Sequence, residues 1–115
     1  MKRLLWLDDL RDPNVDGWVE KYSPIKGLTQ IFWAKNFTEF KLYIEEFGMP
    51  DAICFDHDLG LEESGYDCAK YLVNLCMEKD IDIPAFAIHS MNPIGKHNIE
   101  AILINYHEHY LRTHN

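Results

Sequence analysis

The sequence predicts an α/β domain built on a parallel sheet of four strands. Strand-like apolar runs alternate with helical patterns along the chain, and this alternation produces right-handed crossovers and a parallel sheet with helices on both faces. No β-like run follows residue 88, so the sheet is expected to end at its fourth strand. The chain has 115 residues, of which 47% are hydrophobic, which is enough for one core. We therefore treat residues 1–115 as a single domain.

The first two expected strands enclose an irregular segment. The first strand is the apolar run 4–7, in which Trp6 is expected to be a packing residue, and the second covers 30–34. Prolines and glycines interrupt the segment between them, at Pro13, Gly17, Pro24 and Gly27. We expect mostly loop there, with room for one short helix over 16–22.

The first long helix is expected to start after Asn36 and to stop at Gly48. Asn36 followed three residues later by Glu39 is a capping-box arrangement. The buried stripe at helical spacing consists of Phe37, Phe40, Ile44 and Phe47. Gly48 and Pro50 then end the helix.

The second half of the chain repeats this alternation. We expect a strand over 52–55, a helix over 64–78 and a strand over 83–88. The inward-facing residues of that helix are Ala69, Leu72, Val73 and Cys76. A last helix follows, with Asn92 as its cap and Pro93 at its first position. Its apolar face consists of Ile99, Ile102, Leu103, Tyr106 and Tyr110.

The composition restricts the partners and the compartment. Nineteen acidic residues against 11 basic ones give a net charge of −8, which disfavours broad binding to nucleic-acid backbones. A small phosphorylated ligand stays compatible with this charge, because a metal can invert its local sign. An odd number of cysteines, three, indicates a reducing compartment and small core residues. No apolar run reaches the about 20 residues of a membrane span, so we expect a cytoplasmic protein without a membrane partner.

Polar side chains follow three of the four expected strands. They are Asp8-Asp9, Asp56-His57-Asp58 and His89-Ser90. The carboxyl ends of parallel strands meet at one edge of the sheet, where α/β proteins bind their ligands. Close carboxylates repel each other unless one takes up a proton or a cation lies between them. Asp8, Asp9 and Asp56 are hard oxygen donors of the kind that Mg²⁺ and Mn²⁺ prefer, and we predict that they converge on one divalent cation.

Two histidines stand among these acids. A neutral imidazole can move protons during phosphoryl transfer or ligate a transition metal. His57 and His89 follow neighbouring strands, and each has a polar neighbour in the sequence. We expect both on the polar edge of the sheet rather than in its core.

The segment 89–95 turns a strand into a helix and is a candidate phosphate seat. A helix N-terminus offers unpaired N–H groups and the positive end of a dipole, and Gly95 would let the backbone approach a ligand closely. Arg11, three residues after Asp8, is either a phosphate clamp at the same edge or a solvated loop arginine.

The order of elements and acids resembles the receiver domain of two-component signalling. An acid pair follows the first strand, an aspartate the third and a hydroxyl the fourth. The resemblance implies that Asp8 and Asp9 bind metal, that Asp56 is the phosphoacceptor and that Ser90 is the switch hydroxyl. Two features depart from it. The fifth strand with its phosphoryl-contacting lysine is missing, and histidines follow the third and fourth strands.

A closer resemblance is to a divergent branch, the cyclic-phosphate-processing receiver-like family. It is carried by three motifs, Leu7-Asp8-Asp9-Leu10-Arg11-Asp12-Pro13, Asp56-His57-Asp58-Leu59-Gly60 and His89-Ser90-Met91-Asn92-Pro93-Ile94-Gly95, with Asn98 following. The resemblance implies a receiver-like (flavodoxin-like) three-layer sandwich with strand order 2-1-3-4, truncated before the fifth strand. It also implies a bacterial or phage protein that processes terminal or small cyclic phosphates, including in RNA repair.

The resulting hypothesis is a metal-dependent phosphoesterase that opens a cyclic phosphate, such as a 2′,3′-cyclic phosphate of RNA or of a nucleotide. Its cofactor is Mg²⁺ or Mn²⁺ on the three acids named above. The catalytic residues are His57 and His89 as base and acid, Ser90 as an oxygen-binding hydroxyl, and Asp58 as a metal ligand or a carboxylate that orients a histidine. The phosphate-binding residues are Arg11, Asn92, Gly95 and Asn98.

Two alternatives come from other functional classes. One is a stand-alone receiver-like signalling domain in which Asp56 accepts a phosphoryl group. The other is a module that binds phosphate or a cyclic nucleotide without turning it over. The expected partners are a small phosphorylated ligand or an RNA end, and the edge of the fourth strand or the last helix offers a route to a homodimer.

Overall fold

The computed structural model describes residues 1–15, 17–60 and 63–114, and its sheet has the predicted topology. The elements are β1 (Lys2–Leu7), α1 (Trp18–Tyr22), β2 (Thr29–Ala34), α2 (Phe37–Phe47), β3 (Ala52–Phe55), α3 (Gly65–Lys79), β4 (Ala85–Ile88) and α4 (Pro93–Thr113). All strand pairs are parallel, in the order β2-β1-β3-β4. The order 2-1-3-4 is thus confirmed, and β4 pairs with β3 alone among the described strands.

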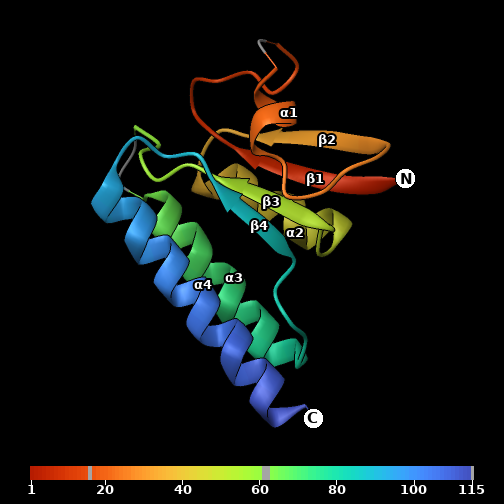
Figure 1. The fold of residues 1–115 in the computed structure, drawn as a ribbon, viewed down its shortest axis with the longest axis vertical. Helices are drawn as coiled ribbons and strands as arrows, with labels where there is room; N and C mark the ends of the chain where they lie inside the picture. Colours follow the sequence, from red (N-terminus) through yellow and green to blue (C-terminus); the bar gives the residue numbers. More distant parts are fainter. Residues whose placement is uncertain (16, 61–62, 115) are drawn as a thin grey trace.

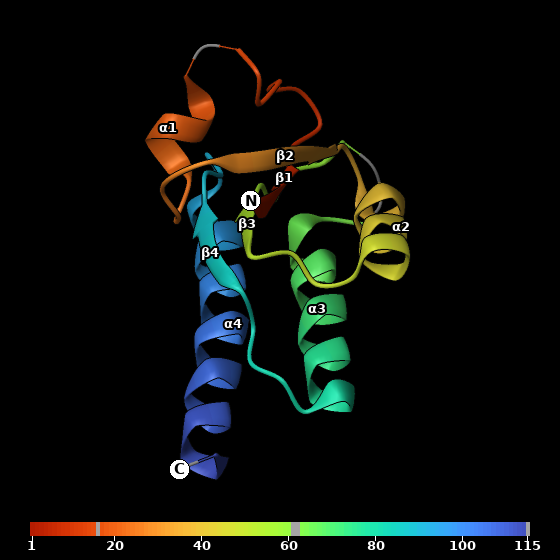
Figure 2. The ribbon, with the colours of Figure 1, turned by 90° about the vertical axis from the view of Figure 1, so that its right-hand side faces the viewer.

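The helices form two layers of unequal size on the faces of this sheet (Figures 1 and 2). One face carries Leu4, Trp6, Ala52 and Cys54, which pack against α1 and the segment that follows it. The other face carries Leu5, Leu7, Ile53 and Phe55, which pack against α2, α3 and α4. Successive side chains of a strand point to opposite faces. Because both faces are covered, β1 and β3 contain continuous apolar runs.

Local capping signals place the helix starts. The Asn36 side chain accepts a hydrogen bond from the Glu39 N–H at 2.9 Å, and Glu39 accepts from the backbone N–H of Lys35 at 2.9 Å. The expected capping arrangement is therefore present, with its return bond one residue earlier than in the standard box. Ser64 caps α3 with a full capping box. Asn92 caps α4, with Pro93 directly after it.

The structure corrects one predicted core residue and one predicted strand boundary. Phe47 was expected in the buried stripe of α2, but it is 51% exposed, whereas Tyr43 is buried, with only 7% of its surface exposed. Phe47 lies in the last turn of the helix, where its ring contacts Phe32 and Tyr43 from the side rather than entering the core. The fourth strand starts at Ala85 and not at residue 83, because Pro84 has no N–H to donate to a strand ladder.

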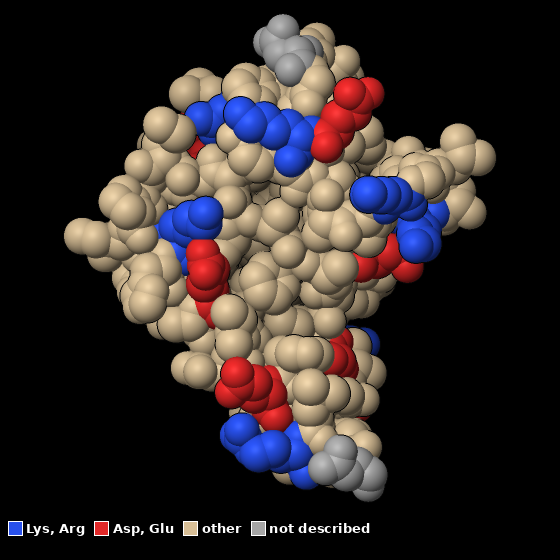
Figure 3. Space-filling model, in the orientation of Figure 1, with Lys and Arg blue, Asp and Glu red and all other residues tan. Residues whose placement is uncertain are grey.

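The surface and the cysteines follow the composition. Cys54, Cys68 and Cys76 are buried and free, which confirms that they are core residues. On the face shown in Figure 3, basic and acidic side chains are interspersed rather than gathered in one basic patch. Among the helices of the described residues, none has both the length and the apolar character needed to cross a membrane.

Candidate functional site

A cavity of about 400 Å³ lies at the carboxyl ends of β1 and β3. Its lining residues are Asp8, Asp9, Leu10, Arg11, Asp56, Asp58, Gly60 and Met91. They come from all three of the motifs found in the sequence. The crossovers of the parallel sheet bring them together, since each motif follows a strand that ends at the same edge.

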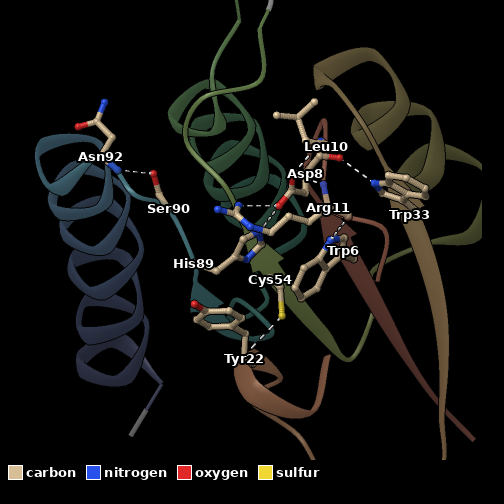
Figure 4. Close-up of polar contacts among 10 residues, drawn as sticks. All are labelled: Trp6, Asp8, Leu10, Arg11, Tyr22, Trp33, Cys54, His89, Ser90 and Asn92. Atoms are coloured by element: carbon tan, nitrogen blue, oxygen red, sulfur yellow. Dashed lines mark hydrogen bonds and ion pairs between the residues drawn. The ribbon is translucent and has the colours of Figure 1, made fainter. Parts of the chain in front are cut away.

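Asp8 is the most heavily hydrogen-bonded side chain of the site (Figure 4). One carboxylate oxygen accepts from the backbone N–H groups of Leu10 and Arg11, each at 2.9 Å. The other accepts from the Arg11 guanidinium at 3.1 Å and lies 3.0 Å from His89 Nε2. Burial alone would raise the pKa of Asp8, but these hydrogen bonds outweigh it and lower the pKa to about 2. Asp8 is therefore a fully buried carboxylate that stays ionised.

Asp56 experiences the opposite balance. It is only 6% exposed, and burial together with the negative charge of Asp8 raises its pKa to about 6. His89 and Arg11 act in the other direction and only partly compensate. Of these two buried carboxylates, Asp8 is stable as an anion, whereas ionisation of Asp56 is energetically unfavourable.

The donor atoms of this group fit a divalent cation. One oxygen of Asp8, one of Asp56 and one ring nitrogen of His89 all lie within 4.8 Å of one another. Two carboxylates and an imidazole are a common donor set for Mn²⁺ and other divalent metals, and the carboxylates also suit Mg²⁺. A bound cation would relieve the repulsion that raises the pKa of Asp56.

Asp9 lies at the cavity but is not among the three closest donor residues. It lines the same cavity, but the close group of possible ligands consists of Asp8, Asp56 and His89. A Cβ added at Gly60 would come within 3.0 Å of an Asp9 oxygen, which places the Asp9 carboxylate beside the loop after β3. The structure therefore brings together two of the three predicted metal ligands and supplies a histidine as the third member of the group.

His89 lies in the core, and the expectation that it lies on the polar edge of the sheet is wrong. Its side chain has no exposed area. One face of the imidazole stacks on Trp6, with ring centroids 4.3 Å apart and planes 8° apart, and Tyr22 of α1 lies 5.6 Å away. Its Nδ1 is buried without a partner within the described part of the chain. Trp6 of β1 and Tyr22 of α1 therefore both contribute to covering the imidazole.

The sequence did not assign a role at the site to three aromatic residues, although the expectation that Trp6 is a packing residue is confirmed. Trp6 donates its indole N–H to the carbonyl of Arg11 at 3.0 Å, and Trp33 donates to the carbonyl of Asp8 at 2.7 Å. Tyr22 covers His89 from α1. A buried tryptophan needs a partner for its N–H group, so the tryptophans in the two strands were a usable signal. No sequence pattern around Tyr22 indicated that it belongs to the site.

His57 and Asp58 form a second group with the start of α4. His57 Nδ1 lies 2.8 Å from an Asp58 oxygen, and the Asn92 amide nitrogen lies 3.4 Å from the same oxygen. The hydrogen bond with His57 lowers the pKa of Asp58. The imidazole is 20% exposed and the carboxylate 65% exposed. The pair is thus accessible to a ligand, unlike His89.

Gly95 has a steric role in this group. A Cβ added at Gly95 would overlap the ring of His57, so only glycine lets the first turn of α4 lie against the imidazole. The N–H of Gly95 already donates to the Asn92 side chain at 2.9 Å. Gly95 therefore positions His57 and does not offer its own N–H to a phosphate in this arrangement.

The remaining predicted phosphate-binding groups are spread more widely. The Ser90 hydroxyl accepts from the Asn92 N–H at 3.1 Å, so the turn before α4 is largely satisfied by its own residues. Arg11 lines the cavity while it pairs with Asp8. Asn98 is exposed on α4, and no hydrogen bond joins it to the site residues in the part of the chain that the structure covers.

Comparisons with known proteins agree with this architecture. The family model described as the cyclic-phosphate processing receiver domain matches residues 3–105. A solved structure described as yeast Spc42 trimeric coiled-coil amino acids 181–211 fused to another structure is 19% identical, with a TM-score of 0.58 over 97% of this chain and 80% of that one. This likeness concerns the fold alone. No curated protein matches the chain. From its family match, its sheet order and its three strand-end motifs, the chain belongs to the cyclic-phosphate processing receiver domain family.

Proposed function

We propose that the chain is a metal-dependent phosphoesterase that hydrolyses a cyclic phosphate. The observation that carries the proposal is the buried pair of Asp8 and Asp56 with His89 inside 4.8 Å. This pair lies at the cavity that also contains Arg11. The carboxylates of Asp8 and Asp56 can bind a divalent cation, and the Arg11 guanidinium beside them can bind an anion. Together these groups suit a ligand whose phosphate contacts both the metal and the arginine.

Asp8, Asp56 and His89 would hold the divalent ion, with Asp9 on the cavity wall as a further oxygen donor. Such an ion supplies a positive charge for the phosphate and lowers the pKa of a bound water. The protein's own contribution is to keep the donors in place. The Leu10 and Arg11 N–H groups orient Asp8, and Trp6 holds the ring plane of His89 by stacking.

The two histidines have different roles in this proposal. His89 has no exposed side-chain area and contacts Asp8, so it acts as a ligand or as a positioning residue for the acid. His57 is partly exposed and is oriented by Asp58, an arrangement that suits a group moving protons to and from a substrate. In place of a His57–His89 acid–base pair, we therefore propose that His57 alone transfers protons.

The reaction needs one water molecule. Its oxygen forms a bond to phosphorus, the bond from phosphorus to one ring oxygen breaks, and the ring oxygen takes up a proton. The product is a phosphate monoester. His57 would accept the proton of the water or deliver one to the leaving oxygen. Arg11 would donate to a nonbridging oxygen from the cavity wall.

The test is hydrolysis of 2′,3′-cyclic nucleotides and cyclic-ended RNA with Mg²⁺ or Mn²⁺ present. We expect His57→Ala to lower the rate by about a hundredfold or more, the usual contribution of a positioned acid or base. His109→Ala removes an exposed histidine at the far end of α4 and is the matched control. Acetyl phosphate is assayed in parallel. Labelling of Asp56 without cyclic phosphate hydrolysis would contradict the proposal and favour a signalling domain. Tight binding without turnover would favour a binding module.

A further inference from the structure

Two large apolar side chains are exposed at the rim of the cavity that Asp8 and Asp56 line. Leu10 and Met91 are each 83% exposed, and both line the cavity together with Asp8 and Asp56. Leu10 follows β1 and Met91 follows β4. Figure 4 shows Leu10 next to Asp8, and it shows Ser90 and Asn92, the neighbours of Met91, at the left near the start of α4.

Neither side chain is held in place by packing against the rest of the protein, because both are largely exposed. The backbone of Leu10 is held by its N–H bond to Asp8 at 2.9 Å, so its side chain is presented by the same turn that orients the acid. Met91 lies between the buried His89 and the capping residue Asn92. A single exposed apolar residue is ordinary on a protein surface. Two of them beside a polar cavity form a place where a ligand can cover apolar area.

We propose that Leu10 and Met91 form a subsite for the base of a nucleoside cyclic phosphate. This inference rests on the proposed function and specifies its substrate class. A nucleobase has two apolar faces, which the two aliphatic side chains can cover, and a polar edge with N–H donors. The exposed Asp58 carboxylate at the same rim can accept from such a donor.

Size and charge favour a mononucleotide or a single terminal nucleotide over a longer strand. A cavity of about 400 Å³ is near the lower end of ordinary small-molecule sites. The net charge of −8 opposes contact with many consecutive phosphates. Arg11 is the basic residue among those that line the cavity, which suits one phosphate group.

The experiment compares two substrates with the same five-membered cyclic phosphate, 2′,3′-cyclic AMP and the base-free glycerol 1,2-cyclic phosphate. The variants are Leu10→Ala and Met91→Ala. The loss of apolar contact in a binding site changes discrimination by about tenfold or more. We therefore expect each variant to lower the ratio of kcat/KM for the nucleotide to kcat/KM for the base-free ester by about tenfold, through a higher KM for the nucleotide.

Matched controls are Leu28→Ala and Met77→Ala, which remove exposed residues of the same type outside this cavity. Both should keep the selectivity ratio of the parent. Equal hydrolysis of the two esters, or an unchanged ratio in the Leu10 and Met91 variants, would overturn the subsite while the phosphoesterase proposal stands.

A binding measurement decides the question if neither ester is hydrolysed. Calorimetry with 2′,3′-cyclic AMP and Mn²⁺ should then show binding that weakens about tenfold in each rim variant. Absent binding, or equal affinity in all proteins, would refute the subsite. Sedimentation of the parent covers one further outcome. A dimer that both rim changes dissociate would show that the rim is a protein contact and would overturn the inference.

Discussion

Replacing Asp56 by asparagine should stabilise the metal-free protein at neutral pH. The pKa of this carboxyl is raised from 3.8 to about 6, first by burial and then by the neighbouring Asp8. The folded state therefore binds the proton more tightly than the unfolded chain does. Stability is greatest below the unfolded pKa, falls as the pH rises towards the folded value, and stays reduced above it. The difference between the two pKa values corresponds to about 3 kcal/mol, and Asp56→Asn removes this cost.

Urea unfolding in the presence of a chelator measures the effect. The parent and Asp56→Asn should have similar free energies of unfolding at about pH 4, and the variant should exceed the parent by about 3 kcal/mol at about pH 7. Glu46→Gln removes an exposed carboxylate from α2 and controls for the loss of one negative charge. A difference that does not depend on pH, or a parent that is the more stable protein at neutral pH, would refute the electrostatic reasoning about the Asp8–Asp56 pair.

Three further predictions concern the same site. Saturating Mn²⁺ should raise the melting temperature of the parent much more than that of Asp56→Asn, because a ligand at about 100 times its Kd adds about 2.7 kcal/mol to the free energy of unfolding. Equal shifts of the two melting temperatures would show that Asp56 is not a metal ligand. Asp8→Asn should destabilise the metal-free protein by about 2 kcal/mol at neutral pH, because hydrogen bonds from His89, Leu10 and Arg11 outweigh burial and lower the pKa of Asp8 to about 2. This contribution is lost in the parent as the pH falls through that value, and urea unfolding across acidic pH measures the loss. Gly95→Ala should cost about 1–3 kcal/mol or displace His57, because the added methyl overlaps the imidazole; unchanged stability together with an unchanged His57 NMR signal would contradict this contact.

The burial of His89 shows where local reasoning stops. The residue follows an apolar run and is followed by a serine, so its sequence surroundings describe a strand end at a polar edge. Tyr22 lies 67 positions earlier in the chain and still contacts its ring. The capping residues behave differently. Asn36 and Asn92 each bond to an N–H three residues away, so the signal and its partner lie within one turn.

The sequence by itself determined the order of strands and helices, the capped helix starts and the arrival of three polar clusters at one sheet edge. These features depend on periodicity and on contacts a few residues apart, which a single chain segment contains. Only the tertiary structure decided that His89 is buried between Trp6 and Tyr22 and that Asp9 lies outside the close group of Asp8, Asp56 and His89. It also decided that Phe47 is exposed and that Gly95 makes room for His57. Each of these depends on how far one element extends over another. Packing between segments that are remote in the sequence decides this, and no local sequence pattern predicts it.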